Sequence, residues 1–240
     1  MAACSNAEED TKARSPLQTL QLQFTREVLP LEACVLSNAV TRTYAIDTSG
    51  GGRAVDVKSG PIPPNEDHRV QAITRNKLLV AKGSRELAIV CELATRELGC
   101  MASMVTIVGS AFQYVLATDY TAFQDAELPR EHTLCQHLLM GDRPLLVQHP
   151  EADVRFSNLD LVVRNGIQFY CGFPIFSQDG LSVVGSLCCL DVRSRELTQS
   201  QYSTLVHLTR TASNIIDVKT HQNGSGQISY LYQQLRAKTV

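Results

Sequence analysis

Cys135, flanked by His132 and His137, is the first group of side chains in this sequence that could do chemistry. A thiol beside an imidazole can act as a nucleophile, because the imidazole can take the thiol proton. On the helix expected over residues 129–140, His132 and Cys135 share a face, but His137 lies about 200° around from Cys135. The three side chains therefore do not converge on one metal ion. Since no oxyanion hole or third orienting residue is indicated, a buried thiol is the default interpretation of Cys135.

Asp153, Arg155 and Phe156 form a second candidate group, within an Asp-Val-Arg-Phe stretch. An acid and a base that alternate in a loop are typical of a structural corner, where the carboxylate caps backbone amides and the guanidinium pairs locally. Arg155 could instead donate hydrogen bonds to an anionic ligand group at the rim of a pocket. Phe156 is then the apolar plug of the corner.

Phe169, Tyr170, Cys171 and Phe173 lie in an apolar run with the composition of a strand. Alternate side chains of a strand point to opposite faces, so Tyr170 lies on one face and the other three on the opposite face. One face should pack on helices and the other should line a pocket, and the sequence leaves open which is which. Because a buried tyrosine hydroxyl needs a hydrogen-bond partner, Tyr170 is the most interesting of the four.

The eight cysteines indicate reduced thiols rather than a disulfide or zinc framework. The adjacent Cys188 and Cys189 should point to opposite faces of a strand, so they are interpreted as two small core residues. No C-x-x-C pair is present, which argues against a zinc finger. With no signal-peptide core at the N-terminus, the sequence predicts a cytoplasmic protein.

The elements that position these residues centre on a hairpin. Two apolar runs, residues 169–177 and 183–191, are separated by the Gln-Asp-Gly turn at 178–180, a strong hairpin signal. Both runs are apolar on both faces, which is typical of the centre of a sheet. Further strands are expected at residues 104–108, 112–117 and 145–147.

Helices are expected at residues 65–77, 84–98 and 129–140 and from Thr198 onward. Gly99 is placed to end the second of them, and Thr198 and Gln201 to form a capping box at the start of the last. The Gly-Ser-Gly stretch at 224–226 is expected to break the last helix, which could resume at 228–235.

Residues 1–60 are expected to be an extension and linker of no recognised family, with residues 1–15 disordered. They could also be the tail of an upstream domain that is truncated here. A helix ending near Pro30 is predicted by the spacing of Leu17, Leu20, Phe24, Val28 and Leu31, and a short strand is predicted near residues 43–46. The glycine-rich residues 47–53 lack the Gly-Lys-Ser/Thr ending of a phosphate loop and are interpreted as linker.

Four stretches in order resemble the GAF domain family, a group of small-ligand sensory modules. They are TLCQH at residues 133–137, PLLV with DVRF at 144–156, FYCGFPI with GSLCCLD at 169–191, and ELT at 196–198. The resemblance covers roughly residues 61–218. The pattern of the residues and the resemblance both indicate an α+β fold: an antiparallel sheet of about five or six strands with helices packed on one face. The resemblance adds loops that roof a pocket on the other face. The GAF-like domain is placed at 61–220, and 221–240 is a tail that could be helical.

The resemblance implies a non-catalytic sensory or regulatory module. It would bind a small molecule of unknown identity, with no cofactor indicated, and relay the change through terminal helices to a partner domain or a second copy in a dimer. The candidate ligand-binding residues are Cys135, Asp153, Arg155, Phe156, Phe169, Tyr170, Cys171 and Asp191.

Three other functions stay open. The pocket could be filled by its own side chains, which would leave a dimerisation or scaffold unit with helices at residues 65–98 and 198–218 as its interface. A thiol enzyme of the free methionine sulfoxide reductase kind needs clustered loop cysteines, and here the middle loops offer only Cys135, with Cys171 on a strand. Cys135 beside His137 looks superficially like a bilin site, but phytochrome-type surroundings are absent.

The charge and hydropathy of the chain exclude other partners. A formal net charge of −2 gives no electrostatic argument for nucleic acid or for an acidic membrane surface. No run approaches the ~18 apolar residues that a membrane span requires. The sequence therefore predicts no nucleic-acid partner and no direct membrane insertion.

Overall fold

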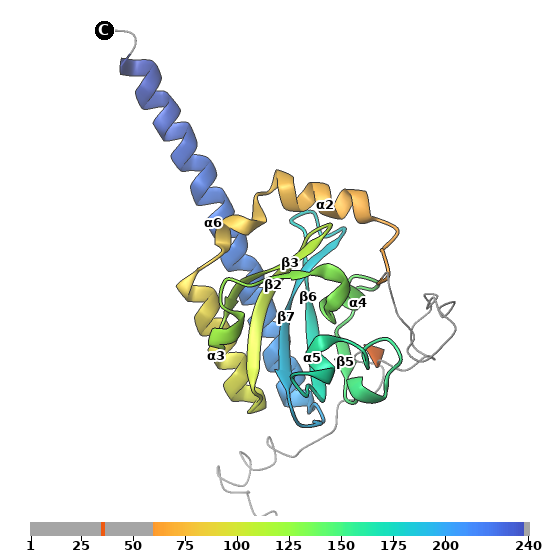
Figure 1. Cartoon of the computed structure of the whole chain (residues 1–240). Helices are drawn as coiled ribbons and strands as arrows, with labels where there is room; N and C mark the ends of the chain where they lie inside the picture. Colours follow the sequence, from red (N-terminus) through yellow and green to blue (C-terminus); the bar gives the residue numbers. More distant parts are fainter. Residues whose placement is uncertain (1–34, 37–59, 238–240) are drawn as a thin grey trace, which may run out of the picture.

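The hairpin of β6 (Phe169–Phe176) and β7 (Val183–Asp191) lies in the middle of the sheet, as predicted. This computed structural model describes residues 35–36 and 60–237, with side chains for residues 60–222. The seven strands in these residues form one sheet in the order β1-β5-β6-β7-β2-β3-β4 (Figure 1). Gly180 takes the positive φ of 72° that the hairpin turn needs. The other strands are β1 (Val35–Leu36), β2 (Ala102–Val108), β3 (Phe112–Thr118), β4 (Glu127–Pro129) and β5 (Leu145–Val147).

Antiparallel pairing joins the sheet from β5 to β4, and β1 alone is parallel to its neighbour β5. The antiparallel part matches the predicted α+β fold of about five or six strands. β1 and β4 were not predicted, because strands of two and three residues carry too little pattern to be read from the sequence.

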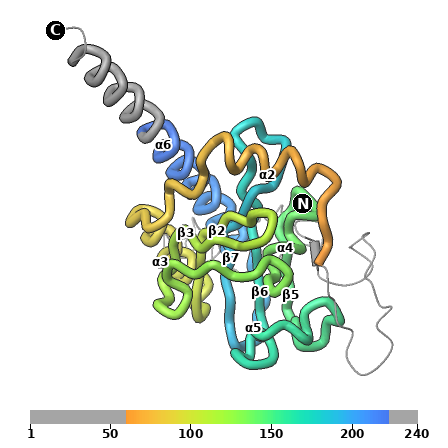
Figure 2. Tube along the Cα trace, turned by 45° about the horizontal axis from the view of Figure 1, so that its top comes forward, coloured from red at the N-terminus to blue at the C-terminus, as the bar shows by residue number. Residues whose placement is uncertain are grey.

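One face of the sheet is covered by helices (Figures 1 and 2). α2 (Glu66–Arg75), the 3₁₀ segment η2 (Leu78–Ala81), α3 (Arg85–Leu98) and α6 (Gln199–Ala237) pack there on the apolar side chains of β2, β3, β6 and β7. The predicted cap at Gly99 is confirmed, because this residue is left-handed at the end of α3. Ser84, which was expected to be the first residue of the helix, is its N-cap and accepts a hydrogen bond from the Leu87 amide. The Thr198 amide donates to Gln201 Oε1 at 3.1 Å, which starts α6 as a capping box.

Short elements of the middle region cover the other face. They are η3 (Thr121–Phe123), η4 (Arg130–His132), α4 (Cys135–Leu138), η5 (Pro150–Ala152) and α5 (Asp160–Val163). In Figure 1, α4 and α5 lie in front of the sheet and α6 lies behind it. A second apolar cluster forms between these loops and the sheet, including Leu134, Phe156, Ile167 and Tyr170.

Two predicted helices are corrected. The helix expected over residues 129–140 is wrong, because Pro129 ends β4 opposite Phe112 and Thr133 is extended, which leaves only η4 and α4. The break expected at 224–226 is also wrong, because α6 runs unbroken to Ala237. Two helical glycines cost about 1 kcal/mol each relative to alanine, but they do not prevent the hydrogen bonds of the surrounding turns.

The N-terminal predictions lie outside the described residues. They are the disorder expected for residues 1–15, the helix expected to end near Pro30, the strand expected near 43–46 and the linker expected at 47–53.

Candidate functional site

β6 separates the predicted site residues onto two faces. Phe169, Cys171 and Phe173 pack in the helix-side cluster, whereas Tyr170 packs in the loop-side cluster. This answers the question that the sequence left open: the Tyr170 side of β6 faces the loops.

A group of thiols and hydroxyls surrounds Cys135 on the loop side, and we call it the thiol cluster: Cys135, Cys188, Tyr170, Ser186 and Thr106. Cys135 Sγ lies 3.4 Å from Tyr170 Oη, 3.4 Å from Ser186 Oγ and 3.6 Å from Cys188 Sγ. Ser186 Oγ lies 3.0 Å from Thr106 Oγ1. All five residues are buried. Cys135 comes from the roof, in α4, and the other four come from three neighbouring strands of the sheet floor.

Gly172 makes room for the Tyr170 side chain. A Cβ atom at position 172 would lie 2.2 Å from Tyr170 Oη, closer than real contacts allow. The missing side chain thus lets the Tyr170 ring fold back along β6 and present its hydroxyl to Cys135.

The thiol cluster shifts the acidity of its members in opposite directions. The hydrogen bond between the Cys135 and Cys188 thiols lowers the pKa of Cys135 to about 7, opposed by burial and helped by the hydrogen bonds from Ser186 and Tyr170. The same hydrogen bond to Cys135, together with burial, raises the pKa of Cys188 well above its ordinary value. Burial is the largest cause that raises the pKa of Tyr170, and the neighbouring thiols add to it. Donors directed at one sulfur therefore favour a thiolate at Cys135.

A small cavity lies against the thiol cluster. Its volume of about 10 Å³ is close to what one water molecule needs. The lining residues are Met104, Gln113, Phe123, Leu128, Thr133, Leu134, Cys135, Leu161, Tyr170, Cys188 and Leu190. Within the described part of the chain, two buried side-chain polar atoms have no hydrogen-bond partner, Gln113 Oε1 and Arg130 Nε. Of these two residues, Gln113 lines this cavity and Arg130 does not.

The Asp-Val-Arg-Phe stretch forms the local pairing of a structural corner. Arg155 Nε donates to Asp153 Oδ1 at 2.8 Å and Nη2 donates to Oδ2 at 2.5 Å. Phe156 is buried beneath this pair, with its ring edge-on to the His137 ring at 4.7 Å between centroids. The pair fixes the loop that follows η5.

Asp191 ends β7 in another local network. Its carboxylate accepts hydrogen bonds from the Arg195 side chain and, at 3.3 Å, from the Arg193 amide. Arg195 also donates to the carbonyl of Leu98 at 3.0 Å, so Asp191 helps join the end of β7 to the end of α3.

Of the eight predicted ligand-binding residues, the cavity brings together Cys135 and Tyr170. The other six, Asp153, Arg155, Phe156, Phe169, Cys171 and Asp191, do not line it. Their assignment as ligand contacts stays a prediction.

The imidazoles do not join Cys135. The His132 side chain is 56% exposed and lies 3.9 Å from Glu131, and His137 packs on Phe156. Within the described residues, no group of three His, Cys, Asp or Glu side chains could hold a metal ion. A Cys135–His132 nucleophile pair is thus not formed.

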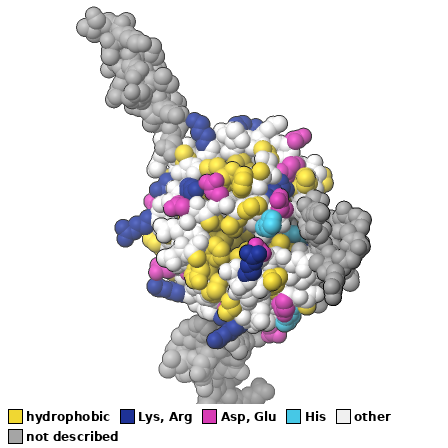
Figure 3. Space-filling model, in the orientation of Figure 1, with side chains coloured by type: hydrophobic (Ala, Val, Ile, Leu, Met, Phe, Trp, Pro, Cys, Tyr) yellow, Lys and Arg dark blue, Asp and Glu magenta, His cyan; other side chains and the backbone are white. Residues whose placement is uncertain are grey.

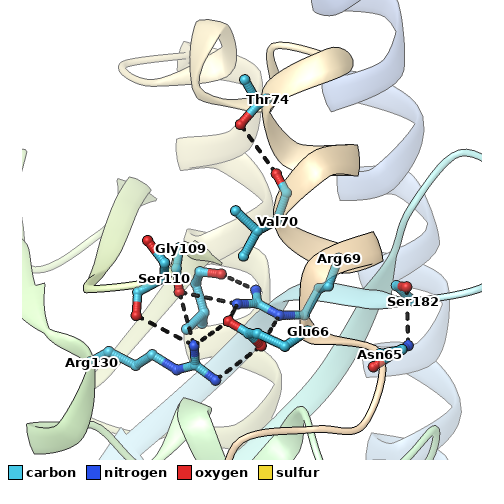
Figure 4. A network of polar contacts seen from close by, with 10 residues as sticks. Asn65, Glu66, Arg69, Val70, Thr74, Gly109, Ser110, Arg130 and Ser182 are labelled. Atoms are coloured by element: carbon cyan, nitrogen blue, oxygen red, sulfur yellow. Dashed lines mark hydrogen bonds and ion pairs between the residues drawn. The ribbon is translucent and has the colours of Figure 1, made fainter.

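A buried charged network, which the sequence reasoning missed, lies at the turn between β2 and β3 (Figure 4). We call Glu66, Arg69 and Arg130 the arginine network. Arg69 is fully buried; it donates to Glu66 Oε1 at 2.7 Å, to the Gly109 carbonyl at 3.1 Å and to the Val108 carbonyl. Arg130 Nη1 lies 2.5 Å from Glu66 Oε1. Burial would raise the pKa of Glu66, but hydrogen bonds from both arginines outweigh it and lower that pKa.

Both missed sets carry a sequence signal. Arg69 falls three and four residues before Ala72 and Ile73 on the buried side of α2, so it is an arginine within an apolar stripe. Gln113 alternates with the buried Val115 on β3, which marks it as a polar side chain on a covered face.

An antiparallel sheet with helices on one face and short loop elements on the other defines the class of fold, and sequence comparison identifies the family. The family model described as "GAF domain" matches residues 83–216, more than half of the chain. The chain belongs to the GAF domain family. The comparison with curated proteins found no match.

Solved structures with similar folds include domains of sensory proteins. A domain of a protein described as a two-component sensor histidine kinase from Sinorhizobium meliloti is 16% identical, with 59% of this chain and 94% of that chain covered and a TM-score of 0.46. The GAF-B domain of DevS from Mycobacterium smegmatis is 12% identical, with 58% and 96% covered and a TM-score of 0.45. The chromophore-binding domain of the R. palustris bacteriophytochrome RpBphP3 is 15% identical, with 68% and 65% covered and a TM-score of 0.49. Likeness at this level transfers no ligand to this chain.

Proposed function

We propose that this GAF domain is a non-catalytic sensory module that binds a small molecule at the thiol cluster and relays the change through α6. The observation that carries the proposal is Gln113 Oε1, a buried acceptor without a partner at the cavity wall. An unpaired buried acceptor costs about 1–3 kcal/mol. A ligand that donates a hydrogen bond to it would recover that cost on binding.

The cavity wall indicates the chemistry of the ligand. Apolar side chains dominate it, and no Asp, Glu, Lys, Arg or His is among the described residues that line it. The polar groups that converge there are the Gln113 amide, the Thr133 and Tyr170 hydroxyls and the Cys135 and Cys188 thiols. A few polar groups in an apolar wall are typical of small-molecule sites. The ligand expected is small and neutral or cationic, with at least one N–H or O–H donor.

Ligand entry requires the roof to move, because the cavity volume is about 10 Å³. The roof side chains Phe123, Leu134 and Leu161 belong to or directly precede helical segments of three or four residues. Such short segments lie at the low end of local stability and can open without unfolding the sheet. Hydrophobic side chains also gather on this face of the molecule (Figure 3).

β6 offers a physical route for the relay. Tyr170 touches the thiol cluster on one face of this strand, and Phe173 packs on Tyr202 of α6 on the other face, with 5.5 Å between ring centroids. A ligand that shifts Tyr170 would therefore move the strand on which α6 rests. The 39-residue α6 then carries the change to a partner domain or a second copy.

A dimerisation or scaffold unit is the second candidate, and the small cavity favours it. Ile89 and Leu93 lie one turn apart on α3 and are 48% and 47% exposed. Lys219 of α6 lies 2.9 Å from Glu86 at the start of α3, which joins the two helices beside these residues. A homodimer through α3 and α6 would cover this apolar surface.

Burial supports a non-catalytic role for Cys135. A low-pKa thiol reacts only when a substrate can reach it, and Cys135 is buried beneath the roof. The free thiols of the described cysteines support a reducing, cytoplasmic compartment. Within the described residues, no helix is long and apolar enough to cross a membrane.

A thermal-shift screen tests the proposed function. Small neutral and cationic molecules with hydrogen-bond donors are screened against the wild-type chain and against Gln113→Leu. The proposal predicts compounds that raise the midpoint of the wild type by several degrees and that of Gln113→Leu by much less. Equal shifts in both chains would place the site elsewhere. If no compound shifts either chain while the protein elutes as a dimer, the scaffold function holds.

A further inference from the structure

A second hollow lies on the helix side of the sheet, away from the thiol cluster. This groove, of about 320 Å³, runs between α6 and the second half of β6. Its lining is mostly apolar and comprises Pro144, Phe173, Pro174, Phe176, Tyr202, Val206, Thr209, Arg210 and Ser213. Phe176, the last residue of β6, is 40% exposed and adds an apolar side chain to the groove.

The groove exists because β5 is short. β5 pairs with β6 only from Tyr170 to Gly172. Beyond Gly172, the described residues provide a strand partner for β6 on the β7 side alone. The half of β6 that lines the groove is therefore an open edge.

The register of β1 brings the N-terminal segment to this groove. β1 is parallel to β5, with Val35 opposite Leu145. The Val35 end of β1 therefore lies at the end of β5 that follows Pro144, which lines the groove. Because β5 is antiparallel to β6, this end of β1 is directed along β6 toward Pro174 and Phe176.

We propose that residues 17–29 form a helix that occupies this groove and that ends before Pro30. The apolar stripe of that segment, made of Leu17, Leu20, Phe24 and Val28, suits a groove walled by apolar side chains. As a helix the segment is about 20 Å long, and the wall of α6 from Tyr202 to Ser213 is about 17 Å long. Residues 30–34 connect the helix to β1.

Charge supports the same occupant. Arg210 lines the groove and makes no ion pair with any described residue. Glu27 lies about 60° from the centre of the apolar stripe, at the edge of the docked face. A docked helix would bring this carboxylate to the rim on which Arg210 stands.

Photo-crosslinking from the groove is the direct test. A benzoylphenylalanine replaces Val206 in the full chain, and the labelled chain is mixed with an equal amount of ¹⁵N-labelled chain. The proposal predicts crosslinks to residues 17–29 within one molecule. Crosslinks that join the light and heavy chains would assign the groove to a second copy, and crosslinks to another segment, or none, would also overturn the proposal.

A matched pair of substitutions tests the docked face. Leu20→Asp places a charge in the stripe, whereas Leu22→Asp places the same charge about 160° away on the helix. Deuterium exchange in the open half of β6 should become about tenfold faster in Leu20→Asp and change less than about twofold in Leu22→Asp. Exchange in β2 and β7 should be unchanged, which shows that both variants fold. An equal effect of the two substitutions, or no effect of either, would contradict the helical docking.

Discussion

The arginine network and the thiol cluster are both buried and polar, but they are bonded very differently. In the arginine network, Glu66 accepts hydrogen bonds from Arg69 at 2.7 and 2.9 Å and from Arg130 at 2.5 Å. In the thiol cluster, the contacts to Cys135 Sγ are 3.4 to 3.6 Å long and involve sulfur, a weak partner. The hydrogen bonds of the arginine network are charge-assisted and short, whereas those of the thiol cluster are longer and weaker.

The difference separates structure from function. Removing one charge from a buried, paired network leaves the others unpaired, so the arginine network holds α2 to the β2–β3 turn in one arrangement. Weak sulfur bonds and the unpaired Gln113 acceptor can be exchanged for ligand contacts at little cost. The comparison predicts that substitutions in the arginine network change stability, whereas substitutions in the thiol cluster change binding.

The largest expected effect on stability is that of Arg69→Met. It removes a cation that pairs with the Glu66 carboxylate and the donor to the Val108 and Gly109 carbonyls. The free energy of unfolding should therefore fall by about 3–5 kcal/mol. Urea unfolding of the full chain measures it. Arg75→Met is the control, because the Arg75 side chain is 64% exposed and should contribute less than about 1 kcal/mol. Similar losses in the two variants would remove the distinction between the network and the surface.

Tyr170→Phe should have a smaller effect on stability. It removes the hydroxyl that donates to Cys135 Sγ, at a cost of about 0.5–1.5 kcal/mol in urea unfolding. Loss of that donor should also raise the pKa of Cys135, which the pH dependence of the Cys135 ¹³Cβ chemical shift measures. Tyr120→Phe, on the exposed loop after β3, is the control. If Tyr170→Phe leaves the Cys135 pKa unchanged, the hydroxyl does not act on the thiol.

The thiol cluster should also give stability a pH dependence. The folded pKa of Cys135, about 7, is below that of a free thiol. Its ionisation therefore adds stability as pH rises from about 7 toward the free-thiol value, and this contribution is lost as pH falls through about 7. The slope of unfolding free energy between about pH 7 and 8.5 should be smaller in Cys135→Ala than in the wild type.

Cys91→Ala is the matched control for this slope. Burial raises the pKa of Cys91 to about 12, so a folded Cys91 stays protonated throughout that window. Removing it should not reduce the slope. Equal slopes in the wild type and Cys135→Ala would show that Cys135 does not ionise in the folded protein.

The smallest effect on stability is expected for Gln113→Leu. The substitution removes an acceptor that has no partner, so unfolding free energy should stay within about 1 kcal/mol of the wild type or rise. Calorimetric or urea unfolding measures this. A loss above about 2 kcal/mol would mean that Gln113 is part of the structure rather than of a site.

The framework of the fold could be predicted because its signals are local. The Asp-Gly turn predicted the β6–β7 hairpin, and Gly99 marked the end of α3. The helix expected over 129–140 failed because pairing of β4 with β3, a tertiary contact, overrides the local pattern there.

The site was predicted only in part, for the same reason. Cys135 and Tyr170 were singled out, but their meeting depends on how α4 docks on the sheet, which no local spacing encodes. Ser186 and Cys188 reach the site because of the way β7 pairs with β2, and Gln113 reaches it because of the way β3 pairs with β2. Neither pairing can be read from local spacing. The arginine network joins residues 64 positions apart, and only an arginine within the apolar stripe of α2 gave any sign of it.

Native mass spectrometry of the wild-type chain and Gln113→Leu tests the assignment of the thiol cluster as a ligand site most directly. Both chains are purified side by side, and any small molecule released on denaturation is identified by its mass. We predict that the wild type retains a small molecule and that Gln113→Leu, folded and equally stable, does not. A wild-type chain that carries no added mass, or a variant that retains the same molecule, would contradict the assignment.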